Sequence, residues 1–258
     1  MLNLKFKPNA KYDLIRLGKE NDGGYLVEKN SLLTTKTLLS FGINDDWSFE
    51  KSFLKINHSK LLALDYSVSG KIFLKSFLEN LTNSFFLLLW NPIKHFQTLY
   101  KSLYTLIDFI IFFKKERTFF QKMIGGPSNQ SLNLSGVIKM MDCQDPIFIK
   151  CDIEGSEYRL LDELKFISKR LSGLVIEFHD VDLNKDKIVK FIEEFSLELV
   201  HTHPNNCGGY DEMGDPLVLE LSFSKNPTKL EGKIKIPNSA DMPNDPNIDD
   251  IDLIFTDV

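Results

Sequence analysis

The segment Phe-Ile-Lys-Cys-Asp-Ile-Glu-Gly-Ser-Glu-Tyr, residues 148–158, decides the fold of this chain. It begins as a short apolar run with β-branched residues, which is typical of a strand buried on both faces of a sheet. The strand is predicted to end before Asp152 and Glu154, and Gly155 then turns the chain into a helix capped by Ser156. Open α/β sheets bind ligands beyond the carboxyl ends of their strands, so these two acids are candidate functional residues. Ordinary solvated acids at a strand-to-helix turn are the alternative.

Strand and helix signals alternate on both sides of this segment, from about residue 36 onward. Such alternation predicts an α/β fold in which helices cover a parallel sheet. A helix capped by Asn184 is predicted up to Phe195. The tail 226–250 is rich in Pro, Asn and Asp and is predicted to be extended, with a short final strand at 252–255. The strands of the sheet are predicted at 37–41, 61–64, 146–151, 174–178, 197–201 and 217–223.

Length and composition are those of a globular protein, with 258 residues, 43% hydrophobic and 26% charged. We expect a single domain over residues 1–258. The chain has 31 basic and 36 acidic side chains, a net charge of −5, which argues against a nucleic-acid partner. The start of the chain alternates charged and apolar residues and predicts no signal peptide. Three cysteines cannot all pair and lack metal-binding spacing, so a cytoplasmic protein is expected.

Residues 68–118 interrupt the alternation and are rich in aromatic side chains. The longest apolar runs are far shorter than the ~20 residues that a membrane-spanning helix needs. We expect a helical insertion of two or three amphipathic helices after the second strand. A subdomain that packs its aromatic residues on itself is the simplest interpretation. The alternatives are a lid over the acceptor site, or peripheral contact with the inner face of a membrane through lysines such as Lys94, Lys101, Lys114 and Lys115.

The ends of the first two predicted strands suggest a cofactor site. Gly42 follows the first strand and allows close approach of the backbone to a ligand. Asp65 ends the second strand, and an acid about 20 residues beyond such a glycine is where nucleotide-binding folds hold ribose hydroxyls. The loop has one glycine instead of the three of a dinucleotide site, and its Asp45 and Asp46 would repel phosphates. The pattern therefore disfavours an NAD(P)-dependent oxidoreductase.

Acids and a histidine are predicted to converge at one edge of the sheet. Glu177 and His179 lie on one face of the strand at 174–178, because successive side chains alternate. If this strand neighbours the one ending before Asp152, then Asp152, Glu154 and His179 come together, since neighbouring strands lie ~4.8 Å apart.

Another strand carries His201 and His203 on one face. Imidazole or carboxylate groups can take a proton from a hydroxyl. The same groups can instead bind Mg²⁺ or Mn²⁺, with Asp152, His179 and His203 as candidate ligands. The sequence leaves direct base catalysis and a metal-assisted reaction open.

The residues 152–157 resemble the Asp-x-Glu-Gly-x-Glu signature of the FkbM-type methyltransferases. This resemblance implies a Rossmann-like class I methyltransferase sheet of seven strands, the last two antiparallel. It also implies S-adenosylmethionine as methyl donor and a sugar or surface-glycan hydroxyl as acceptor, with Glu50 and Gly24 among the cofactor contacts. The first loop has fewer glycines than is usual in the family, so its backbone contacts stay open. Other segments that resemble the family are 18–27, 38–50, 174–180, 201–209 and 216–223.

The sequence therefore predicts an S-adenosylmethionine-dependent O-methyltransferase. A sulfonium without phosphates is compatible with the acidic first loop. A non-catalytic scaffold for surface-glycan assembly, docked through residues 68–118, is the alternative from another class. In the favoured interpretation the methyl donor is bound by Gly42, Asp65, Glu50 and Gly24, and the chemistry is carried by Asp152, Glu154 and His179.

Overall fold

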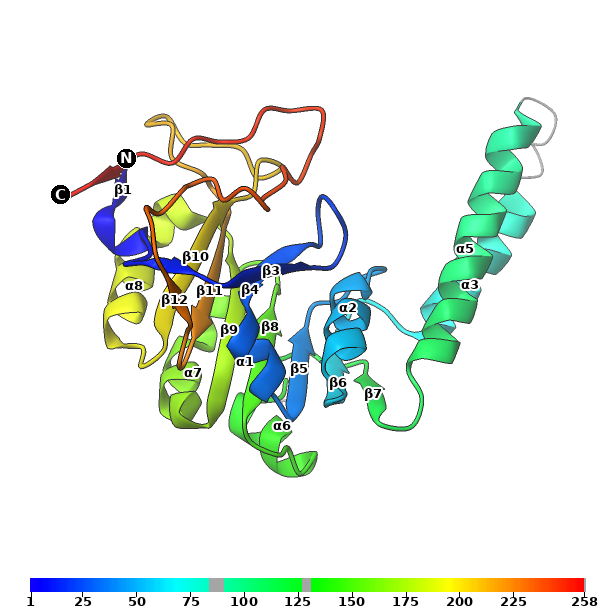
Figure 1. Cartoon of the computed structure of the whole chain (residues 1–258). Helices are drawn as coiled ribbons and strands as arrows, with labels where there is room; N and C mark the ends of the chain where they lie inside the picture. Colours follow the sequence, from blue (N-terminus) through cyan, green and yellow to red (C-terminus); the bar gives the residue numbers. More distant parts are fainter. Residues whose placement is uncertain (84–90, 127–130, 258) are drawn as a thin grey trace.

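A seven-stranded sheet forms the centre of the computed structural model, which describes residues 1–83, 91–126 and 131–257 (Figure 1). Its strand order is β10–β11–β9–β8–β5–β6–β7. Strands β5 to β9 are parallel, and β11 runs antiparallel to both β9 and β10. The strands are β5 (Thr37–Phe41), β6 (Lys60–Leu64), β7 (Arg117–Phe120), β8 (Ile147–Cys151), β9 (Leu171–Phe178), β10 (Glu198–Pro204) and β11 (Leu219–Ser224).

This strand order identifies the fold class. Counted along the chain from β5 to β11 as strands 1 to 7, the order is 3-2-1-4-5-7-6, that of the Rossmann-like class I methyltransferase sheet. The predicted α/β fold and the antiparallel last pair are confirmed. The chain runs outward from β5 to β7 on one side and from β8 to β9 on the other. The carboxyl ends of β5 and β8 therefore form a topological switch point, where such sheets bind ligands.

Helices bury both faces of the sheet, which is why its strands are continuous apolar runs. Leu39, Phe41 and Ile149 pack on the face covered by α6 (Leu134–Met140), α7 (Leu161–Ile167) and α8 (Val181–Glu194). The alternate residues Leu38 and Phe148 pack on the opposite face, with α1 (Lys29–Thr34) and α2 (Ser48–Ile56).

The two ends of the chain pack beside each other at one edge (Figure 1). β1 (Leu2–Asn3) pairs with β13 (Phe255–Thr256), which shares only Phe255 with the final strand predicted at 252–255. β2 (Lys11–Tyr12) pairs with β12 (Lys229–Leu230), and β3 (Leu14–Leu17) forms a hairpin with β4 (Tyr25–Glu28). The short 3₁₀ helices are η1 (Leu4–Phe6), η2 (Glu157–Arg159) and η3 (Ser168–Arg170).

Two long helices project from the sheet as an arm, α3 (Gly70–Asn83) and α5 (Pro92–Phe112) (Figure 1). They confirm a helical insertion between β6 and β7. The root of the arm packs on the body through Trp47, whose ring centroid lies 5.5 Å from that of Phe109. No described helix is long and apolar enough to cross a membrane. The apolar run at 85–90 that contributed to the prediction lies outside the described residues.

Two helix starts differ from the predictions. The α8 helix begins at Val181, after Asp180 with φ 49°, and not at Asn184, whose amide donates to the Asp180 carbonyl at 3.0 Å. Ser156 makes no capping hydrogen bond, and η2 precedes α7 there. The cause is tertiary: the carboxylate of Glu157 is buried and accepts the backbone N–H of His179 at 2.7 Å.

Candidate active site

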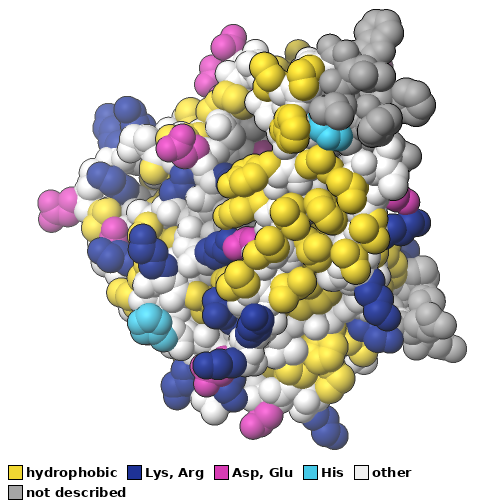
Figure 2. All heavy atoms as spheres, turned by 90° about the vertical axis from the view of Figure 1, so that its right-hand side faces the viewer, with side chains coloured by type: hydrophobic (Ala, Val, Ile, Leu, Met, Phe, Trp, Pro, Cys, Tyr) yellow, Lys and Arg dark blue, Asp and Glu magenta, His cyan; other side chains and the backbone are white. Residues whose placement is uncertain are grey.

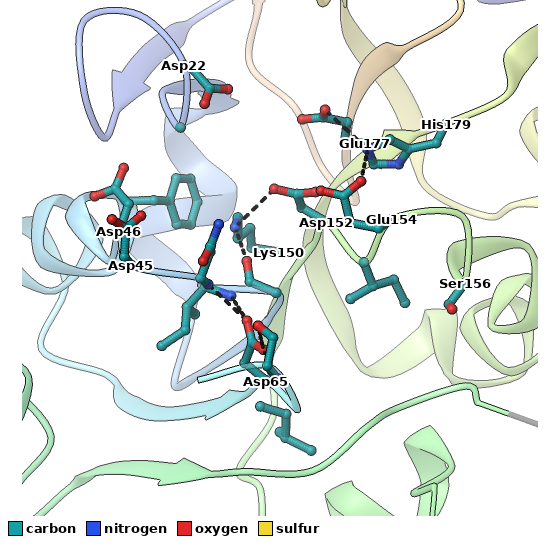
Figure 3. A pocket seen from close by; sticks show the side chains of 18 of the residues that line it. Asp22, Asp45, Asp46, Asp65, Lys150, Asp152, Glu154, Ser156, Glu177 and His179 are labelled. Carbon is teal, nitrogen blue, oxygen red and sulfur yellow. Dashed lines mark hydrogen bonds and ion pairs between the residues drawn. The ribbon is translucent and has the colours of Figure 1, made fainter. Parts of the chain in front are cut away.

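A cavity of about 690 Å³ opens beyond the carboxyl ends of β5, β6, β8 and β9 (Figure 3). Its size lies in the range of cofactor and small-molecule sites. The wall is acidic, since seven carboxyl side chains and three lysines line the described cavity. The acids are Asp22, Asp45, Asp46, Asp65, Asp152, Glu154 and Glu177, and the lysines are Lys19, Lys122 and Lys150.

Gly42 borders this cavity at the end of β5, as predicted, but its conformation has another cause. Its φ is +74°, and a Cβ atom there would lie 1.5 Å from the carbonyl oxygen of Asp152. A side chain would separate the ends of β5 and β8. Glycine is thus required first by the close approach of two protein backbones.

Asp65 is buried at the end of β6 and holds the loop after β5. One carboxylate oxygen accepts the backbone N–H groups of Ile43 and Asn44, each at 2.9 Å. The other accepts the N–H and hydroxyl of Ser67, at 2.7 and 2.6 Å. These bonds use about all four acceptor positions of a carboxylate. The structure therefore assigns Asp65 a loop-holding role, and ribose binding stays a prediction.

Asp46 occupies the amino-terminal end of α2. Its carboxylate accepts the backbone N–H and the hydroxyl of Ser48, at 3.0 and 3.1 Å. Lys19 pairs with the same carboxylate at 3.0 Å. In dinucleotide-binding folds a pyrophosphate takes the place beside such a helix start. A carboxylate stands there in this protein, which opposes a phosphate ligand.

Glu50 and Gly24 do not line the cavity, which corrects their predicted cofactor contacts. The Glu50 side chain is fully buried against Ser40 below the site, and this burial raises its pKa. A Cβ atom on Gly24 would lie 2.0 Å from the carbonyl oxygen of Lys19, so this glycine closes the loop before β4. Its neighbour Gly23 borders the cavity instead.

Asp152, Glu154 and His179 come together at one end of the cavity, and their ligand atoms all lie within 4.8 Å of one another. Asp152 and Glu154 follow β8 and His179 follows β9, so the convergence results from the pairing of these neighbouring strands. Glu154 has φ +52°, an unusual conformation for a non-glycine residue, and its side chain is 86% exposed. Strained backbone of this kind is common at functional sites.

His179 is oriented from behind by Glu157. Its Nδ1 lies 3.3 Å from the buried Glu157 carboxylate, which directs Nε2 toward Glu154 at 3.5 Å. Burial opposes protonation of His179, but the Glu157 hydrogen bond and nearby carboxylates outweigh it and raise the pKa to about 9. The imidazole therefore carries a proton at neutral pH. This corrects the hypothesis that it is a ready general base in the free site.

Lys150 and Glu177, which were not among the predicted site residues, also line this end of the cavity, and Tyr25 lies behind them. The Tyr25 hydroxyl lies 3.1 Å from Asp152 and 3.0 Å from Glu177. Burial and neighbouring acids raise the pKa of Glu177 well above its ordinary value. Because the hydroxyl has one proton, it can donate to only one of these two carboxyl groups at a time.

Lys150 is buried in β8, and its ammonium group lies 3.6 Å from Asp152 and donates to the Gly42 carbonyl at 2.6 Å. A lysine inside an apolar strand was the signal in the sequence that could have identified it. For Glu177, the signal was the face that it shares with His179.

His203 does not join this group, which corrects its place among the candidate metal ligands. It is 2% exposed and lies 3.2 Å from Glu220 and 3.4 Å from Asp250. Asp250 belongs to the carboxyl-terminal tail. The side chain of Asn206, in the next loop, donates to tail carbonyls of Asp245 and Ile248, each at 3.0 Å. This second cluster fastens the tail to the body.

Comparisons with known proteins bear on the fold alone. No protein-family model and no curated protein matches the chain, so the FkbM resemblance stays a prediction. A precorrin-6y C5,15-methyltransferase from Geobacter metallireducens is 13% identical, with 76% of this chain and 83% of that chain covered and a TM-score of 0.35. The Methanococcus jannaschii fibrillarin pre-rRNA processing protein is 9% identical, with coverages of 83% and 82% and a TM-score of 0.37.

A third solved structure, a putative sarcosine dimethylglycine methyltransferase from Galdieria sulphuraria, is 10% identical, with coverages of 76% and 80% and a TM-score of 0.34. Scores this low carry no functional argument. The strand order of the sheet itself places the chain in the class I methyltransferase fold.

Proposed function

We propose that this protein is an S-adenosylmethionine-dependent O-methyltransferase. The observation that carries the proposal is the acidic cavity at the switch point of a class I sheet, with Asp46 at the start of α2. Seven carboxyl groups against three lysines and the protonated His179 favour a cationic ligand. A sulfonium with an amino group fits this charge, whereas the pyrophosphate of NAD(P) would meet Asp46 and its neighbour Asp45.

The two ends of the cavity suggest a division of roles. The loop after β5, held by Asp65, is proposed to bind the methyl donor through its backbone and through Gly42. The end at Asp152, Glu154 and His179 is proposed to receive the acceptor hydroxyl. Both ends line one continuous cavity, so a donor methyl and an acceptor oxygen can meet inside it (Figure 3).

The three converging residues also suit a divalent cation. Two carboxylates and an imidazole are ligands of Mn²⁺, and Mg²⁺ accepts the carboxylates. The buried Glu157 behind His179 is the kind of outer partner that orients metal-ligating histidines. Mg²⁺ or Mn²⁺ bound here would lower the pKa of a sugar hydroxyl. Asp152, Glu154 and His179 would hold the ion.

The proposed roles of the residues follow from their protonation. The bound methyl donor supplies an electrophilic methyl group on sulfur, and the acceptor oxygen forms a bond to that carbon as the carbon–sulfur bond breaks. Asp152 faces the cavity, is held by Tyr25 and Lys150, and is placed to orient the hydroxyl and take its proton. Without a cation, protonated His179 is placed to stabilise negative charge on the acceptor oxygen, whereas it would have to lose its proton to hold a cation. A sugar or surface-glycan acceptor remains the finer proposal from the family resemblance.

Calorimetry with S-adenosylhomocysteine and NAD tests the cofactor assignment. We expect S-adenosylhomocysteine to bind with a micromolar Kd and NAD to bind at least ~10²-fold more weakly. Asp46→Lys is the informative variant, because it should weaken S-adenosylhomocysteine binding. Tighter binding of NAD would overturn the proposal in favour of an oxidoreductase. Binding of neither ligand would favour the non-catalytic scaffold.

Metal dependence is tested once an acceptor is found among sugars. Treatment with EDTA should abolish turnover, and addition of Mg²⁺ or Mn²⁺ should restore it. If EDTA does not change turnover, the reaction does not need a cation, and Asp152 acts as a direct base.

A further inference from the structure

The outer face of the helical arm is apolar and unpartnered in this chain. Of the 26 large apolar side chains that are exposed among the described residues, 12 belong to α3 and α5. These 12 are Ile72, Leu74, Leu78, Leu81, Ile93, Phe96, Tyr100, Leu103, Tyr104, Ile107, Ile110 and Ile111. Figure 2 shows apolar side chains gathered over the side where the arm projects. Patches of this extent on a protein surface mark interaction sites.

The helix α5 has two apolar sides, one packed on the body of the protein and the other exposed. Its inner side packs on the body through Leu106, Phe109 and Phe112, which are buried. Its outer side carries apolar residues three or four apart, such as Phe96, which is 62% exposed, and Tyr100, which is 71% exposed. The exposed apolar residues of α5 are thus separate from those that pack into the protein core. It is a second apolar surface with large aromatic side chains.

Charge is divided between the arm and the rest of the protein. Residues 68–118 contain seven basic and three acidic side chains, a net charge of +4. The whole chain has 31 and 36, which leaves 24 basic and 33 acidic side chains outside the arm, a net charge of −9. Within the described part of the chain, Lys71, Lys94 and Lys114 have no ion-pair partner. In Figure 2, Lys and Arg side chains border the apolar face.

Lysines also stand directly beside the apolar groups. A groove on α3 is lined by Leu74 and Leu78 together with Lys71, Lys75, Thr82 and Glu79, which pairs with Lys75. On α5, Lys94 follows the exposed Ile93. A long lysine side chain beside apolar residues can reach outward to an anionic group while its stem covers apolar surface.

We propose that the arm lies on the surface of an anionic lipid bilayer, with its outer apolar face in the headgroup region and its lysines on acidic lipid headgroups. Interfacial helices have this combination of an apolar face and basic flanks, with a net hydrophobicity too low to span a membrane. The described helices satisfy the last condition. A second copy of the arm is a poorer occupant, because residues 68–118 carry a net charge of +4 and two copies would repel. This inference does not depend on the proposed methyl transfer.

Sedimentation of the full chain with vesicles tests the proposal. We expect binding to vesicles of phosphatidylcholine with phosphatidylglycerol to be at least about tenfold tighter than to phosphatidylcholine alone, and to weaken in high salt. Phe96→Ser with Tyr100→Ser and Ile107→Ser should abolish binding. Lys71→Gln with Lys94→Gln and Lys114→Gln should remove the preference for the anionic lipid.

Matched controls separate this role from a general change in surface. Phe166→Ser with Leu183→Ser removes two apolar side chains, 82% and 77% exposed, outside the arm and should leave binding unchanged. All variants should retain the native circular dichroism spectrum. They should also retain the native affinity for S-adenosylhomocysteine or the native melting temperature. No binding of the native chain to anionic vesicles, or equal loss in the control, would overturn the proposal. Self-association that the arm variant alone abolishes, without vesicle binding, would overturn it in favour of a second copy.

Discussion

Two histidine–carboxylate clusters lie at the same edge of the sheet, yet only one of them borders the cavity. His179, with Glu154 and Glu157, has a side chain that is 16% exposed, whereas His203, with Glu220 and Asp250, is 2% exposed. Both histidines are held protonated by their carboxylates. The comparison teaches that residue types alone do not make a site: the first cluster can reach a ligand, and the second can only hold protein to protein.

The largest expected effect is on stability, in the buried cluster. His203→Ala leaves Glu220 and Asp250 without their cation, and removal of one partner of a buried ion pair costs ~3–5 kcal/mol. We expect the free energy of unfolding, measured in urea, to fall by that amount. His58→Ala, at an exposed position, is the matched control and should change it little. A loss below ~1 kcal/mol would contradict the fastening role, and His203→Gln tests it if the alanine variant does not fold.

The accessible cluster should behave in the opposite way. His179→Ala is expected to lower turnover by at least ~10²-fold, while the affinity for S-adenosylhomocysteine stays nearly unchanged. The reason is that His179 lies at the proposed acceptor end, away from the loop that Asp65 holds. Single-turnover kinetics with an identified acceptor and calorimetry give the two measurements. Near-native turnover in both His179→Ala and Asp152→Ala would remove this cluster from the chemistry.

The donor end of the cavity offers a smaller effect. Asp65→Ala removes the acceptor of the Ile43 and Asn44 backbone N–H groups and should weaken S-adenosylhomocysteine binding by ~1–3 kcal/mol, the cost of lost charged hydrogen bonds. Calorimetry measures it, with Asp162→Ala on the exposed surface as control. An unchanged affinity in a folded Asp65→Ala protein would show that the loop does not bind the donor.

A pH dependence also separates the clusters. Carboxylate partners raise the pKa of His179 to about 9 and that of His203 to about 10, against the opposing effect of burial. Both values exceed the ordinary pKa of histidine, ~6.5, so the stabilisation is full below that pH and is lost as the pH rises through 9 and 10. Each histidine contributes a slope of at most ~1.4 kcal/mol per pH unit. The unfolding free energy should be measured for His203→Gln and for the native protein at pH 6, 8 and 9.5. The variant should lack the part of the fall in stability that comes from deprotonation of His203. Parallel curves would contradict the raised pKa of His203.

Much of the sheet could be predicted because its strands carry their own signal. The runs at 37–41 and 61–64 are apolar on both faces, as strands covered by helices on both sides must be. Helix starts were predicted less well. The Ser156 position reads locally as a cap, but the Glu157 carboxylate is used by the backbone of His179, 22 residues away. Local patterns do not contain such a contact.

The candidate site divides in the same way. The convergence of Asp152, Glu154 and His179 follows from strand ends and the pairing of β8 with β9. The sequence could not show that Glu50 and Gly24 lie outside the cavity wall. Their positions depend on how the hairpin of β3 and β4 and the helix α2 pack above the sheet.

The sequence by itself determined the α/β alternation, the acidic character of the first loop and the position of the carboxylates after the third predicted strand. These are local properties, set by the period of apolar residues and by the residue types at strand ends. Only the tertiary structure decided that His179 faces the cavity while His203 fastens the tail, and that the arm has a second, exposed apolar face. Protonation and access to ligands depend on neighbours that are distant along the chain, so they arise only when those segments pack together.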